Sequence, residues 1–71
     1  MNFSELLSVE QRKEILESRI LNFAVEAYQV SLNKQVAEAT EDLTAVEQAN
    51  NALATLESAI QVYKDELATI A

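Results

Sequence analysis

The sequence predicts an all-α fold, an antiparallel two-helix hairpin with coiled-coil character, completed by oligomerisation or by a partner. In each half of the 71-residue chain, apolar residues recur with alternating spacings of three and four. That spacing is typical of a helix that buries one narrow seam against another helix. The chain contains no Gly and no Pro, the residues that most often end helices and form turns. Long helices with a single break therefore account for the pattern.

The first predicted helix covers about residues 9–39. Ser8 and Gln11 have the spacing of a capping box, in which each side chain bonds the backbone amide of the other residue. Glu10 in the first turn suits the positive end of the helix dipole. The seam of this helix contains one polar residue, Lys34, whose alkyl stem can lie along apolar surface while its ammonium group stays in water. The ladder consists of Leu16, Ile20, Phe23, Ala27, Val30, Lys34 and Ala37.

The break between the helices is expected near residues 39–42. Continuing the first ladder reaches Glu41 rather than an apolar residue, so the two ladders do not form one seam. Thr40 and Asp42 are both good N-caps, and Thr44 with Glu47 is another possible capping box. The second helix is therefore predicted over about residues 43–70.

The second ladder continues the 3-4 spacing to the end of the chain. Helices of about 47 and 42 Å, from 1.5 Å per residue, have matched lengths, and the short connection favours an antiparallel hairpin. The rival is one unbroken helix of about 60 residues with a coiled-coil stutter at the break. The members of the second ladder are Val46, Ala49, Leu53, Leu56, Ile60, Tyr63, Leu67 and Ile70.

The chain forms one predicted domain over residues 1–71, in which residues 1–8 are an N-terminal segment. This segment either folds back over the end of the hairpin, docks on a partner, or is a frayed terminus with a few apolar residues. It has more apolar surface than one hairpin can cover. Small residues on a helix let a second backbone approach closely, and Tyr is frequent at interfaces. We therefore expect a homo-oligomer, such as a four-helix bundle of two hairpins, or docking onto a larger assembly. The predicted contact residues are Tyr28, Ala45, Ala49, Ala52 and Ala59, and Ala24 and Val36 also lie off the main seam.

The composition argues against enzymatic chemistry. There is no His and no Cys, so the commonest general base and the commonest soft metal ligands are missing. Without Gly there is no phosphate-binding loop. Glu10, Glu14 and Glu17 share one helix face, but di-iron bundles pair such residues with a Glu-x-x-His motif that this chain lacks. We predict no catalytic, cofactor or metal residues and no small-molecule substrate.

The charge pattern limits the partners. The net charge is −7, and residues 40–71 contribute −5 through six acidic residues and one basic residue. Binding to nucleic acid or to anionic lipid requires positive charge, so neither is expected. Apolar runs are far shorter than the ~20 residues that span a bilayer. Residues 1–8 have no positively charged region and no long apolar run, so we expect no targeting signal and a cytoplasmic location.

Two stretches of the chain prompt a comparison with known proteins. FAVEAYQVSLNK (residues 23–34) and LATLESAIQVYKDEL (residues 53–67) resemble small, acidic, Ala- and Gln-rich helical proteins of tailed bacteriophages, particularly marine and cyanobacterial ones. The resemblance implies a minor structural or accessory component of a phage assembly, in the host cytoplasm or the virion, or a small modulator of a host protein. It assigns no role to any residue.

Two functional hypotheses follow from these observations. The first is a non-enzymatic helical protein–protein interaction module that works inside an assembly. The alternative is a small acidic inhibitor that binds a basic surface of a host nucleic-acid-binding protein. Ionic strength separates the two hypotheses, because contacts between charged surfaces weaken as the Debye length shrinks and apolar contacts persist.

Overall fold

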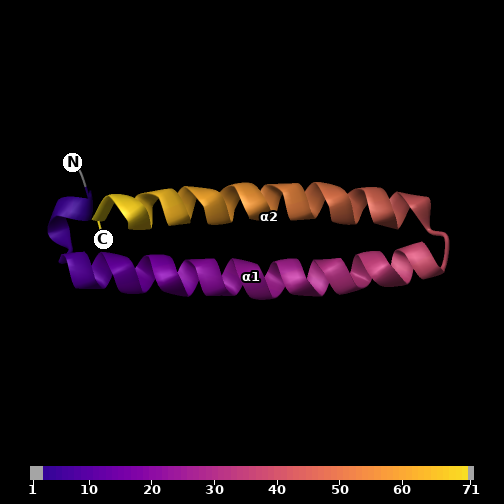
Figure 1. The fold of residues 1–71 in the computed structure, drawn as a ribbon, viewed down its shortest axis with the longest axis horizontal. Helices are drawn as coiled ribbons and strands as arrows, with labels where there is room; N and C mark the ends of the chain where they lie inside the picture. Colours follow the sequence, from indigo (N-terminus) through magenta and orange to yellow (C-terminus); the bar gives the residue numbers. More distant parts are fainter. Residues whose placement is uncertain (1–2, 71) are drawn as a thin grey trace.

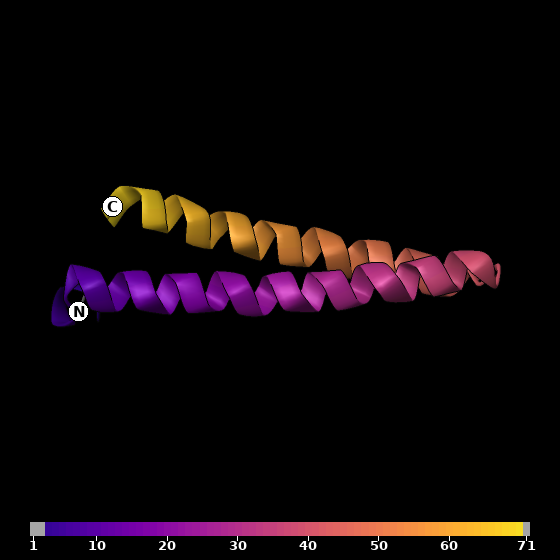
Figure 2. The same ribbon diagram turned by 60° about the horizontal axis from the view of Figure 1, so that its bottom comes forward.

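The computed structural model describes residues 3–70 and shows an antiparallel hairpin of two long helices (Figure 1). A short 3-10 helix, η1 (Phe3–Leu6), precedes α1 (Val9–Ala39) and α2 (Leu43–Ile70). The molecule measures 49 × 19 × 17 Å, close to the length of one helix, so a single unbroken helix is excluded. When the molecule is turned by 60°, the helices overlap near the turn but not at the open end, so they cross at an angle (Figure 2).

The start of α1 follows from the capping box at Ser8. The Gln11 amide donates to Ser8 Oγ at 3.1 Å, and the Ser8 amide donates to Gln11 Oε1 at 2.9 Å. Two backbone donors that a helix start leaves without partners are thereby satisfied. The prediction that the helix begins directly after Ser8 is confirmed.

The turn between the helices depends on three consecutive residues. Thr40 ends α1, and Glu41 adopts a left-handed conformation with φ of 57°. The Glu41 amide donates to the Glu38 carbonyl at 3.2 Å, and the Asp42 amide donates to the Ala37 carbonyl at 2.9 Å. This pair of bonds is the Schellman motif, which usually has Gly at the left-handed position. The chain has no Gly, and Glu41 takes that position instead.

Asp42 also starts the second helix. Its carboxylate oxygen Oδ1 accepts from the Ala45 amide at 3.1 Å, and its carbonyl accepts the first helical bond from Val46 at 3.0 Å. Of the candidate caps named from the sequence, Asp42 is the one used. Thr40 instead bonds backward to the Val36 and Ala37 carbonyls, and Thr44 lies within the first turn of α2.

The seam between α1 and α2 contains the residues of both ladders. Every ladder residue is buried or half-buried, including Lys34. Near the middle of the seam, the Phe23 and Tyr63 rings stack with centroids 5.6 Å apart and an interplanar angle of 13°. Such a pair stabilises the contact beyond its buried area, by roughly 0.5–1.5 kcal/mol. Within the described part of the chain, the most deeply buried apolar residues are Leu16, Ala37, Ala49 and Leu56, which are 6–9% exposed.

Leu56 should dominate the stability of this thin core. Its side chain is only 6% exposed, so Leu56→Ala should lower the free energy of unfolding by roughly 2–4 kcal/mol through lost burial and a residual cavity. The neighbouring Glu57 is exposed, and Glu57→Ala should change it by less than about 0.5 kcal/mol. Urea unfolding followed by circular dichroism measures both values. Equal losses would show that the wrong face has been assigned to the core.

The left-handed residue offers a second test. Glu41→Gly should raise the free energy of unfolding by about 0.5–1 kcal/mol, because Gly adopts positive φ without a Cβ clash. Glu41→Gln controls for the lost charge and should change stability by less than about 0.5 kcal/mol. Glu38→Gly, inside the last turn of α1, should be destabilising by about 1 kcal/mol. Thermal unfolding of the three variants measures these effects. A Glu41→Gly variant that unfolds at a lower temperature than the unsubstituted protein, as Glu38→Gly should, would contradict the assigned turn.

Candidate interaction surface

The most prominent surface feature is a second apolar face on α1. Among the described residues of α1, large apolar side chains remain exposed at spacings of four, three, four and four, which places them on one helix face. The first four follow seam residues by five positions, so this face is turned about 140° away from α2. We call this face the outer stripe, and it consists of Leu21, Val25, Tyr28, Leu32 and Val36.

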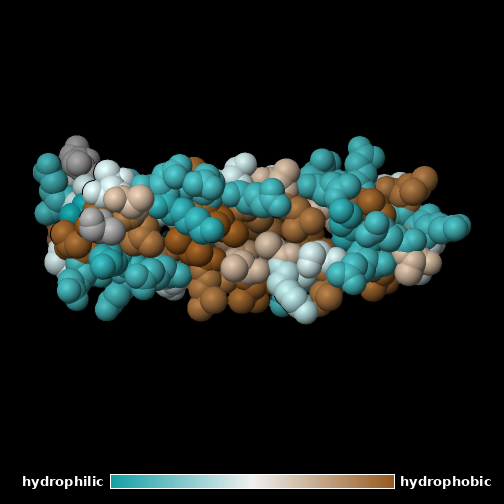
Figure 3. Space-filling view, viewed as in Figure 1, coloured by the Kyte–Doolittle hydropathy of each residue, from teal (hydrophilic) through white to brown (hydrophobic). Residues whose placement is uncertain are grey.

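The side chains of the outer stripe are substantially accessible. Leu21 and Val36 are each 63% exposed, Tyr28 is 61% exposed, and Leu32, the least accessible, is still 43% exposed. Around the middle of the stripe, Ala24, Val25, Tyr28, Gln29 and Leu32 line a shallow depression. In Figure 3, apolar side chains gather over the middle of α1, whereas hydrophilic side chains cover much of α2 and both ends of the hairpin.

Charge is sparse along this stretch. Residues 21–36 contain one acidic residue, Glu26, and one basic residue, Lys34, and Lys34 lies half-buried at the seam. Depletion of charge is the compositional mark of an interface centre. Toward the start of α1 the surface becomes charged, where Glu10, Lys13, Glu14 and Glu17 lie together. The apolar surface of the stripe therefore does not extend to the start of α1.

The structure places the contact residues predicted from the sequence in two different environments. Tyr28 lies at the centre of the exposed stripe. Ala49 is 8% exposed and belongs to the seam of the hairpin itself. Ala45, Ala52 and Ala59 are half-buried beside that seam. That a partner contacts these four alanines remains a prediction, and the larger accessible apolar surface lies on α1.

Most of the outer stripe was missed by sequence reasoning. Tyr28 and Val36 were singled out as lying off the seam, but Leu21, Val25 and Leu32 were not. The signal was present, because these residues repeat the helical spacing of the seam five positions later. On α2 the corresponding outward surface is different, since among its described residues only Leu43 and Val62 are large, apolar and exposed.

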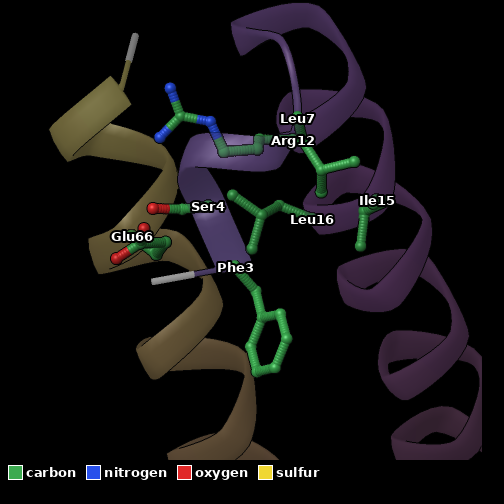
Figure 4. Close-up of a pocket in the computed structure, with 7 residues that line it drawn as sticks. All are labelled: Phe3, Ser4, Leu7, Arg12, Ile15, Leu16 and Glu66. Atoms are coloured by element: carbon green, nitrogen blue, oxygen red, sulfur yellow. The ribbon is translucent and has the colours of Figure 1, made fainter. Parts of the chain in front are cut away.

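A small apolar cavity lies at the open end of the hairpin (Figure 4). The segment around η1 crosses this end, which is one of the three alternatives that the sequence left open for residues 1–8. Phe3, Leu7 and Leu16 line the cavity. Arg12 lies at its rim, and its buried Nε atom has no hydrogen-bond partner among the described residues. Glu66 of α2 also lines the cavity. The volume of the space is about 190 Å³.

The described residues offer little else that points to chemistry. Within residues 3–70, no group of three or more His, Cys, Asp or Glu side chains is arranged to hold a metal ion. None of the described helices is both long and apolar enough to cross a membrane. Comparisons with protein-family models, with curated proteins and with solved structures found no match to this chain. The outer stripe is therefore the candidate site.

Proposed function

We propose that the protein is a non-enzymatic interaction module that associates with other protein through the outer stripe of α1. One observation carries the proposal, the continuous exposed apolar face from Leu21 to Val36. Large contiguous apolar patches on small proteins mark interaction sites, because leaving them in water forfeits burial energy. Tyr28 at the centre supplies the rigid, amphipathic side chain that is enriched among the strongest contacts of interfaces.

The architecture supports the same proposal. Four buried apolar residues make a small core for residues 3–70, while twelve large apolar side chains are exposed there. Small domains often gain stability from association with another chain. The resemblance of residues 23–34 and 53–67 to phage helical proteins agrees with a minor structural or accessory role in a phage assembly, in the host cytoplasm or the virion. The absence of His and Cys gives no support to a catalytic role.

A thiol footprint tests this proposal in the cell that makes the protein. The chain has no Cys, so Val25→Cys and Ser58→Cys each introduce one thiol, on the outer stripe and on the exposed side of α2. Relative to the thiol at residue 58, the thiol at residue 25 should react with a maleimide at least about tenfold more slowly in the cell than in dilute purified protein, because burial excludes the reagent. The ratio is used because competing cellular thiols slow the reaction at both positions alike. Full reactivity at residue 25 in the cell would contradict the proposal.

The acidic surface favours a second candidate function, inhibition of a host nucleic-acid-binding protein by occupation of its basic surface. Glu47, Glu57 and Asp65 are exposed on α2, within the half that carries a net charge of −5. Such a contact would rest on charge complementarity and would be screened by salt.

The same footprint separates this candidate from the first. An acidic inhibitor should show protection at residue 58 in cell extract at low ionic strength, and that protection should be lost at about 0.5 M salt. Replacing Glu47, Glu57 and Asp65 by their amides should abolish it at every salt concentration. Protection confined to residue 25, and retained at high salt, would exclude the inhibitor function.

A further inference from the structure

We infer that the occupant of the outer stripe is a second copy of this chain, packed antiparallel against it about a two-fold axis beside Tyr28. The inference rests on the proposed function and names its partner. Two hairpins would then meet through α1 alone. Because the stripe lies about 140° from the seam, the four helices would form an open layer, with α2 of each copy outermost, rather than a compact square bundle.

The spacing of the stripe is nearly palindromic, as a two-fold interface requires. A two-fold contact uses the same surface on both copies, so residue i meets residue j and j meets i. In an antiparallel pair centred between residues 28 and 29, residues whose numbers add to 57 face each other. Leu21 then faces Val36 of the second copy, and Val25 faces Leu32 of the second copy. Each layer thus combines one Leu and one Val, and the two Tyr28 rings meet at the centre.

Charge distinguishes antiparallel from parallel packing. Glu14 and Glu17 precede Leu21 by seven and four residues, so they continue the face of the stripe toward the start of α1. Parallel packing would place each of them beside its own counterpart, and like charges so placed repel. Antiparallel packing instead places them beyond the end of α1 of the second copy, beside the turn, where Glu38 and Glu41 are exposed. Contact between identical carboxylates is thereby avoided.

The chain exposes more surface than a compact monomer of its mass, because the hairpin is elongated. The chain exposes 5407 Å², whereas the scaling of surface with mass gives about 4,400 Å² for a compact monomer of this size. The excess of about 1,000 Å² per chain is comparable to the roughly 800 Å² that each partner buries in a stable interface. Each copy carries a net charge of −7, so mutual repulsion opposes pairing and added salt should strengthen the dimer.

Disulfide cross-linking tests the partner and its direction together. Val25→Cys and Leu32→Cys are prepared as separate proteins, each a small apolar replacement at an exposed position. Antiparallel packing brings residue 25 next to residue 32 of the second copy. Two residues 25 lie about 10 Å apart along the axis, beyond the ~7 Å limit for a disulfide. Oxidation of the equimolar mixture should therefore give the mixed cross-linked species, at least about tenfold more than either protein alone.

Sedimentation of the uncross-linked protein gives the second readout. At micromolar concentration the dimer should be present, and Tyr28→Glu should weaken it at least about tenfold by placing a charge at the interface centre. Ser58→Glu adds the same charge on the outside of α2 and should leave the dimer intact. Circular dichroism confirms that both variants remain helical.

Each other outcome overturns the inference in a distinct way. Efficient cross-linking of Val25→Cys with itself would establish parallel pairing. A monomer at all concentrations, with no cross-linking, would exclude a second copy as the occupant. If residue 25 is nevertheless protected in the cell, the stripe binds a different protein and the proposed function survives. If it is reactive there as well, both proposals fail.

Discussion

The whole structure depends on one narrow seam between two helices. Among residues 3–70, no third element covers either helix along its length, so the order of the molecule comes from a single row of interlocking side chains on each. A helix in water gains little stability from its own hydrogen bonds and depends on burying one face. The composition helps, because Ala, Leu, Glu and Gln lose little side-chain entropy in a helix and the chain is rich in them. Because each helix packs through one seam, its opposite side stays exposed to solvent.

The elements of this fold were predictable because local and tertiary signals agree. The two ladders, the capping box at Ser8 and the interruption near Thr40 all gave the helix limits that the structure shows. The details of the turn were not predictable, because several polar residues there are competent caps. Which one is used depends on the left-handed conformation of Glu41, and no propensity scale favours Glu for that conformation. The geometry of closing two packed helices overrides the local preference.

The candidate site was predicted only in part, and the reason is instructive. Tyr28 is distinctive in the sequence because it is aromatic and lies off the seam. Its aliphatic neighbours Val25 and Leu32 are residue types that are common throughout helices. An amphipathic pattern identifies one buried face readily, whereas a second apolar face on the same helix weakens the contrast between apolar and polar sides even though its own spacing is regular. The alanines of α2 stood out by their regular repeat, yet Ala49 is used inside the hairpin. Burial, which only the folded structure gives, separates the two kinds of stripe.

The double role of Asp42 constrains how this hairpin can change its length. Its amide completes the end of α1 while its side chain begins α2, so the connection contains no spare residue. An insertion there would separate the two roles of Asp42, and an insertion within α2 would rotate the rest of its ladder by about 100° per residue away from α1. At the open end, by contrast, both helices can be extended together by seven residues without disturbing the register. Longer or shorter versions of this architecture should therefore differ at the open end and keep the turn.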